Sequence, residues 1–197
     1  MRKIISREII RHIPFTALSS FLGILIAIFL LQKFQSPSEW FEIMHPLHIL
    51  ASAIISSAIY YKYKSKFFRA LVIGSAVSLL VGTLSDVCLP YISGKILGLS
   101  LHFHLPLLHE PLLILLSALA GSTIGITLKL TKLPHFIHVF LSVFASSFYI
   151  LSAVTDISIM IFLTLVLIVS LVVIVPCCVS DIVLPLLCLS SKKRIQK

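Results

Sequence analysis

Two pairs of histidines with the same internal spacing lie 90 residues apart in this chain. Residues 45–60 read HPLHILASAIISSAIY, and residues 135–150 read HFIHVFLSVFASSFYI. The two histidines of an HxxH pair project from one face of a helix. Imidazole nitrogens placed in this way can bind a first-row transition metal ion or exchange protons near neutral pH.

Two aspartates and two further histidines recur in the same order around these pairs. SDVCLP at 85–90 matches SDIVLP at 180–185, and HIP at 12–14 matches HEP at 109–111. Each copy therefore predicts a site of imidazole nitrogens and one carboxylate oxygen, which suits a divalent metal ion. The candidate metal-binding residues are His45, His48, Asp86 and His109 in one set, and His12, His135, His138 and Asp181 in the other.

The composition of the two sets bears on which ion they would hold. Neither set contains cysteine, which argues against an ion that prefers thiolates and favours Zn²⁺, Fe²⁺ or Mn²⁺. Without a metal, the same side chains would cap helix starts and lie at the level of the lipid headgroups. His102 and His104 form a further patch that could collect cations, although we favour an interfacial loop helix whose polar residues face water.

The elements that must carry these residues are strongly apolar. The chain is 58% hydrophobic and 12% charged, whereas soluble domains are about 25% charged. Its mean hydropathy is +1.11. Apolar runs near the roughly 20 residues that cross a bilayer lie at 14–32, 44–61, 70–91, 111–128, 134–154 and 157–176. We therefore expect an all-α, polytopic membrane protein with six transmembrane helices.

The distribution of basic residues predicts the orientation of these helices. Of the 16 lysines and arginines, all but Lys33 and Lys95 lie before the first run, after the second, after the fourth, or in the tail. The positive-inside rule places these segments, and both termini, in the cytoplasm. The net charge of +9 thus reports topology and not a nucleic-acid partner. A multi-pass protein of the inner (cytoplasmic) cell membrane is expected.

The recurring motifs predict two copies of a three-span unit. Because three is odd, the second copy enters the membrane from the opposite side, as in the inverted repeats of secondary transporters. This arrangement puts the His45 set toward the outer face and the His135 set toward the inner face. The expected divisions are a first repeat at 1–92 (with an amphipathic segment at 1–13), an outer His-bearing connector at 93–108, a second repeat at 109–190 and a basic tail at 191–197.

Small residues and prolines add expectations about packing. Repeated serines and the Gly121–Gly125 spacing predict close contacts between helices. Pro90, Pro176 and Pro185 lie near the aspartate motifs and predict bent or re-entrant helix ends.

Three functions fit the pattern. We favour a small transporter for a divalent metal ion or for a metal- or proton-coupled solute, with His48 and His138 as the deepest ligands. A transmembrane b-type cytochrome is the alternative, but one HxxH helix cannot bracket a haem iron from both sides. A membrane-embedded metal-dependent hydrolase ranks last, because an enzyme needs no mirrored sites. The expected partners are the lipid bilayer and a small ion or solute, and a homodimer is left open.

Overall fold

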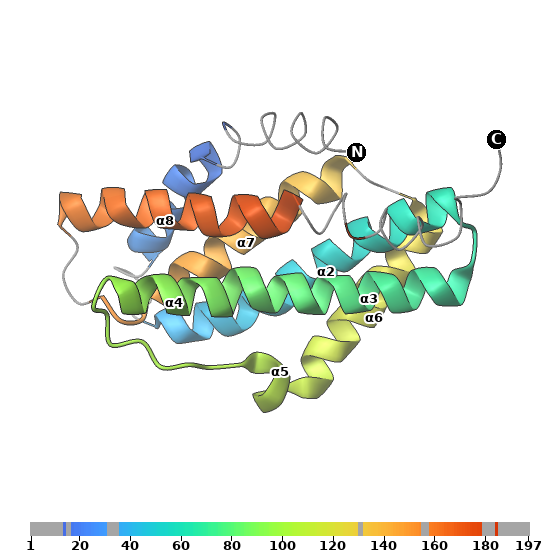
Figure 1. Ribbon diagram of the computed structural model, residues 1–197, viewed down its shortest axis with the longest axis horizontal. Helices are drawn as coiled ribbons and strands as arrows, with labels where there is room; N and C mark the ends of the chain where they lie inside the picture. Colours follow the sequence, from blue (N-terminus) through green and yellow to red (C-terminus); the bar gives the residue numbers. More distant parts are fainter. Residues whose placement is uncertain are drawn as a thin grey trace.

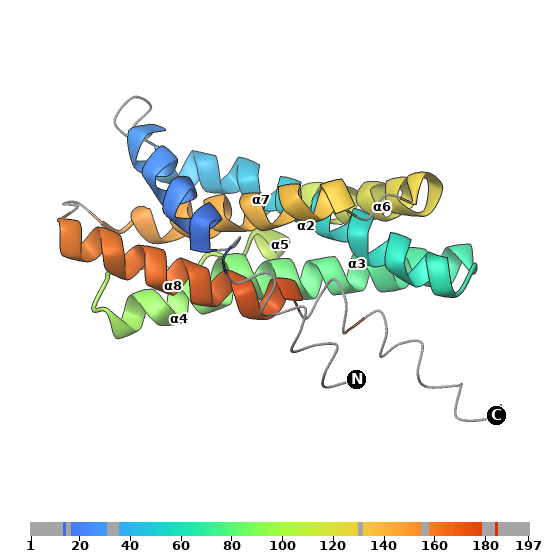
Figure 2. The same ribbon diagram turned by 90° about the horizontal axis from the view of Figure 1, so that it is seen from above.

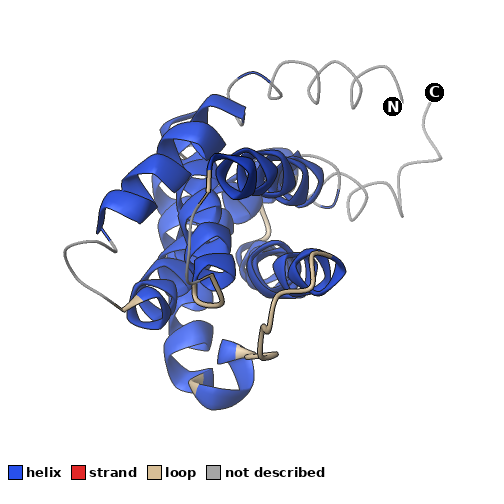
Figure 3. Cartoon of the chain, turned by 90° about the vertical axis from the view of Figure 1, so that its left-hand side faces the viewer, coloured by secondary structure: helices blue, strands red, loops and turns tan. Residues whose placement is uncertain are grey.

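The computed structural model describes residues 14, 17–30, 36–129, 132–154, 158–178 and 184, without the side chains of 132–136, 174, 175, 177 and 178. All regular structure in these ranges is helical (Figure 3). In chain order the elements are the helix Ala17–Leu30, α2 (Pro37–Tyr63), α3 (Phe67–Thr83), the π turn η1 (Leu84–Cys88), α4 (Leu89–Ile96), α5 (Pro106–His109), α6 (Pro111–Leu128), α7 (Lys132–Leu151) and α8 (Ile159–Cys178).

Three helices in this part of the chain are long and apolar enough to cross a membrane. They are α2, the continuous helix Phe67–Ile96 that joins α3, η1 and α4, and α6. Large apolar side chains such as Phe68, Leu112 and Met160 are exposed on the outside of the bundle, as expected where lipid and not water is the solvent. These features indicate an all-helical membrane protein.

Two helices, α2 and the continuous helix Phe67–Ile96, extend at both ends beyond the apolar runs that predicted them. The run at 44–61 lies inside α2, which starts earlier at Pro37. Proline is well placed at the start of a helix because its missing N–H would have no partner there, and Glu39 complements the positive end of the helix dipole. Polar residues at the ends of a span lower the local mean hydropathy, so a search for apolar runs omits them although they belong to the helix.

Pro90 was predicted to lie at a bent or re-entrant helix end, but the helix continues beyond it to Ile96. The chain passes through Pro90 within the single rod formed by α3, η1 and α4 (Figure 1). The N–H of Leu89 donates to the carbonyl of Leu84, five residues back. In that register the next carbonyl, of Ser85, would have to pair with Pro90, which has no N–H. The hydroxyl of Ser146 on α7 donates to this carbonyl instead, at 3.1 Å. Pro176 likewise lies inside α8, and Pro185 lies outside the described residues.

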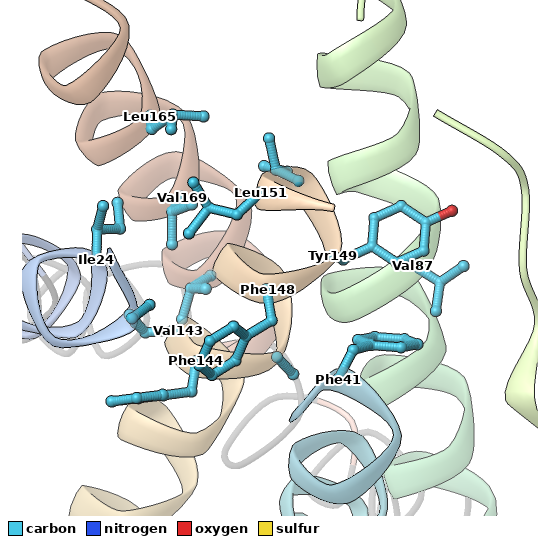
Figure 4. Packing of buried hydrophobic residues seen from close by; sticks show 14 of the residues in the cluster. Ile24, Phe41, Val87, Val143, Phe144, Phe148, Tyr149, Leu151, Leu165 and Val169 are labelled. Atoms are coloured by element: carbon cyan, nitrogen blue, oxygen red, sulfur yellow. The ribbon is translucent and has the colours of Figure 1, made fainter. Parts of the chain in front are cut away.

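α2 and α7 lie side by side in antiparallel directions near the centre of the molecule (Figure 2). Trp40, near the start of α2, stacks on Phe148, near the end of α7, with ring centroids 5.8 Å apart. Phe41 meets Tyr149 edge to face at 5.2 Å. These aromatic contacts belong to the main buried cluster, which also joins Val87 of η1 (Figure 4).

Two glycine-lined contacts bring further helices against this pair. A Cβ on Gly121 of α6 would collide with the carbonyl oxygen of Leu50 on α2, and one on Gly125 with that of Ile54. A Cβ on Gly23 would instead meet the side chain of Val143 on α7. The predicted close packing at Gly121 and Gly125 is therefore present, and both glycines face backbone.

Candidate functional site

One face of α2 carries a buried line of polar residues. Their spacing of three and four residues keeps them on a single helical face. All four side chains are fully buried. In chain order they are His45, His48, Ser52 and Ser56.

Asp86 in η1 joins the two histidines of this line. Its Oδ2 accepts a hydrogen bond from Nδ1 of His45 at 2.9 Å and from Nδ1 of His48 at 2.6 Å. All three side chains are fully buried. The structure thus brings together three of the predicted site residues, although Asp86 lies 41 positions after His45 and 38 after His48 in the sequence.

The second oxygen of Asp86 also has two donors. The hydroxyl of Ser85 donates to Oδ1 at 2.7 Å, and the hydroxyl of Ser142 on α7 donates to it at 3.0 Å. An unpaired carboxylate in a dry interior costs several kcal/mol. Four convergent donors from α2, η1 and α7 offset that cost, so the π turn holds Asp86 where three elements meet.

These hydrogen bonds fix the state of both imidazoles. Each ring gives its Nδ1–H to the carboxylate, so in the neutral ring Nε2 carries a lone pair and no proton. Nε2 of His45 and Nε2 of His48 are both buried, and neither has a hydrogen-bond partner in the described ranges. The cluster therefore contains two nitrogen lone pairs that are buried and have no hydrogen-bond partner among the described residues.

His138 lies against this cluster and not apart from it. The sequence grouped it with the inner set, but its ring stacks on that of His48, with centroids 4.5 Å apart and planes at 14°. The sequence pattern could not give the point at which α2 and α7 meet.

His109, in contrast to His138, lies apart from the set with which the sequence grouped it. It was grouped with His45 and Asp86, yet it is exposed on the short helix α5, where its ring stacks on His104. His135 lies on α7 with a side chain outside the described set, and His12 and Asp181 lie outside the described residues altogether. The structure therefore joins His45, His48, Asp86 and His138, and it leaves His109 at the surface.

A cavity of about 220 Å³ lies next to the cluster, at the end of the bundle where α2 starts. Its lining includes Phe41, Glu42, His102, His104 and Tyr149. Phe41 also stacks on His45 at 5.5 Å, so its ring separates the cavity from the buried cluster. The hydroxyl of Tyr149 donates to the carbonyl of His102 at 2.9 Å and accepts from the N–H of His104 at 3.4 Å, which holds the connector in place.

Sequence reasoning missed two contributors to this site. Ser142 was interpreted as a packing residue, although it donates to Asp86. Its repeated position beside an HxxH pair was the signal. Phe41 drew no attention, yet it lies four residues before His45 on the same face of α2 and stacks on it.

The donor geometry limits how a metal could bind. In the described part of the chain, no three His, Cys, Asp or Glu side chains form a ready metal-binding group. Both Asp86 oxygens are already engaged by donors. Among the described side chains of the cluster, the potential metal-ligating atoms that lack a hydrogen-bond partner are Nε2 of His45 and Nε2 of His48.

Comparison with known proteins gives no further guide. The chain matches no protein-family model, no curated protein and no solved structure. A function for it must rest on the geometry of its own residues.

Proposed function

We propose that the protein is a small secondary transporter whose transported or coupling cation, a divalent metal ion or a proton, binds at His45, His48 and Asp86. The observation that carries this proposal is the complete burial of these three ionisable side chains in two helices suited to cross a membrane. Such residues are costly at that depth, and in membrane proteins they mark ion and proton pathways.

The position of the cluster supports a transport mechanism. Asp86, His45 and His48 come from the first predicted three-span unit, whereas Ser142 and His138 come from the second. Inverted-repeat transporters bind their cargo between two such units, and rocking of one unit against the other opens the site to each side in turn. A cation held by the first unit, at residues that Ser142 and His138 of the second unit contact, would respond directly to that motion.

Equivalent contacts in the two units support the inverted repeat itself. At the offset that aligns the HxxH pairs, Ala53 corresponds to Val143, and the sequence also aligns Gly23 with Gly121. Gly121 packs against Ala53, and Gly23 packs against Val143. The first helix of each unit would then pack on the second helix of the other. We accordingly propose six spans in a 3+3 arrangement in the cell membrane, with both termini in the cytoplasm.

Neither alternative function receives comparable support. His48 and His138 stack face to face, whereas axial ligands of a haem must reach the iron from opposite sides of the macrocycle. A lipid hydrolase needs a metal that its substrate can reach, but the cluster is fully buried beneath Phe41.

Flux through reconstituted vesicles tests the proposal. Purified protein in liposomes should move Zn²⁺, Mn²⁺ or protons, measured with trapped metal-sensitive or pH-sensitive dyes. His48→Ala should lower this flux to the level of empty vesicles, and Asp86→Asn should lower it strongly. His109→Ala changes an exposed histidine of the same predicted set and serves as the matched control, with flux retained. Flux that is unchanged in His48→Ala or in Asp86→Asn, or wild-type protein that moves none of these ions, would refute the proposal.

Cysteine labelling tests the topology separately. In a background without the native cysteines, Lys64→Cys should react with an impermeant thiol reagent only from the cytoplasmic side. Lys95→Cys should react only from the outer side. Labelling of both from one side would rule out the proposed orientation.

A further inference from the structure

Two buried nitrogen atoms in the cluster lack any partner within the described residues. They are Nε2 of His45 and Nε2 of His48, and both side chains are fully buried. Buried polar atoms almost always have a hydrogen-bond partner, so each exception needs a physical explanation such as a bound water or ion. Here two exceptions lie one helical turn apart and share one carboxylate.

The hydrogen bonds determine what these nitrogens can accept. Oδ2 of Asp86 receives the Nδ1–H of both rings, so each neutral ring presents its Nε2 lone pair. A histidine that donates one ring N–H to a carboxylate and keeps the other nitrogen free has the arrangement typical of metal ligands. The carboxylate fixes the tautomer and orients the ring while remaining outside the coordination sphere.

The charge of the cluster also favours a cation. With both imidazoles neutral, the Asp86 carboxylate gives the buried group a formal charge of −1. Its four hydrogen-bond donors are neutral. A cation next to the two Nε2 atoms would therefore be stabilised by the carboxylate through the rings.

We propose that His45 and His48 bind a divalent transition metal ion through their Nε2 atoms, with Asp86 as the outer carboxylate that orients both rings. As an assignment of the cargo this inference rests on the proposed function, whereas metal binding itself does not. It changes the role predicted for Asp86 from ligand to positioning residue.

The donor types select the class of ion. Two imidazole nitrogens suit Zn²⁺, Co²⁺ or Ni²⁺, whereas Mg²⁺ and Ca²⁺ require shells of oxygen. No third His, Cys, Asp or Glu side chain of the described ranges joins the pair as a ligand, so the protein supplies two ligands. Two protein ligands hold an ion less tightly than the four of a structural zinc site. Weak binding suits a site from which the ion must leave.

Nitrogen NMR of the purified full-length protein in detergent provides the direct test. With ¹⁵N-labelled histidine, His45 and His48 should show the Nδ1–H tautomer near neutral pH, and added Zn²⁺ should shift both Nε2 signals. Single His→Ala variants would assign the signals. An Nε2–H tautomer, or a metal shift at Nδ1, would overturn the proposal. The tautomer and the zinc shift are both measured on the wild-type protein, and the variants serve only to assign the signals.

Zinc affinity measured by titration calorimetry separates ligands from the positioning residue. His45→Ala and His48→Ala should each remove the bound zinc found by elemental analysis. Asp86→Asn should retain it with affinity lowered by about 10- to 100-fold, the effect typical of an outer partner. His102→Ala and His109→Ala should leave it unchanged. Equal loss in Asp86→Asn and His48→Ala, or no zinc bound at millimolar concentration, would overturn the proposal.

The two proposals fail in different ways. Zinc binding at both Nε2 atoms without ion flux in vesicles would refute the transporter and leave the metal site intact. Proton flux that depends on Asp86, in a protein that binds no zinc, would refute the metal site and leave the transporter intact.

Discussion

The polar faces of α2 and α7 carry the same residues at equivalent positions, but those residues have different partners. On α7, Ser142 donates to the Asp86 carboxylate and Ser146 donates to the Ser85 carbonyl. The equivalent hydroxyls on α2, of Ser52 and Ser56, are buried and have no partner in the described part of the chain.

The difference comes from the neighbouring element and not from the serines. α7 lies against η1, where the π turn presents Asp86 and Pro90 leaves a carbonyl without its N–H. In the proposed repeat, the segment equivalent to Ser85–Asp86 is Ser180–Asp181, which lies outside the described residues. Identical side chains thus have hydrogen-bond partners on α7 and none among the described residues on α2.

The largest effect is expected when the shared acceptor is removed. Asp86→Ala leaves four donors from three elements without their common partner, and breaking a buried polar group in this way costs about 3–5 kcal/mol. We expect a sharply lower thermal unfolding temperature in detergent, followed by the fluorescence of Trp40. A variant as stable as the wild type would mean that Asp86 does not organise the α2–η1–α7 junction.

The next largest effect is expected at the glycine contacts, where alanine at Gly121, which packs on α2, should destabilise the protein more than alanine at Gly23, which packs on α7. Gly121→Ala drives a methyl group into the backbone of α2, whereas Gly23→Ala meets only side-chain atoms of Val143 and Phe144 on α7. Overpacking costs about 1–3 kcal/mol, and the larger value belongs where backbone must shift. Ala120→Leu, on the exposed side of α6, is the matched control and should be neutral. Equal unfolding temperatures for the two glycine variants would contradict the difference.

Replacing the serine of α7 that donates to Asp86 should lower the free energy of unfolding by less than replacing Asp86 itself. Ser142→Ala removes one donor from a buried carboxylate, which costs about 1–3 kcal/mol when the acceptor is left under-satisfied. The unfolding temperature should fall, and zinc affinity should change little because the imidazole bonds to Asp86 are intact. An unchanged unfolding temperature would show that Ser142 and Asp86 do not interact.

The equivalent change on α2 should have the smallest effect. Ser52→Ala deletes a buried hydroxyl that has no partner in the described ranges, so the unfolding temperature should be unchanged or slightly higher. A loss as large as that of Ser142→Ala would reveal a partner for Ser52, and Asp181→Asn in the same background would then test whether that partner is the second aspartate.

Sequence reasoning reached the class of protein and part of the site for identifiable reasons. Helical periodicity and hydropathy are local properties, so the shared face of His45 and His48 and the apolar helices could be predicted. The contact between His48 and His138 could not, because it depends on the point at which two helices meet. The fate of Pro90 depended on a hydroxyl 56 residues away, since Ser146 satisfies the freed carbonyl. The six spans and the roles of His12, His135 and Asp181 stay predictions.

The π turn also decides how the helix Phe67–Ile96 is phased. One extra residue in a turn rotates everything that follows by about 100° relative to an uninterrupted α-helix. Before the turn, α3 packs on α2 and α6, and after it α4 packs on α7 and α8. One continuous helix thereby serves two sets of neighbours. Deleting a single residue within Leu84–Cys88 would restore ordinary α-helical phase and turn α4 away from both partners, so even a deletion that keeps Asp86 should disrupt the packing of α4.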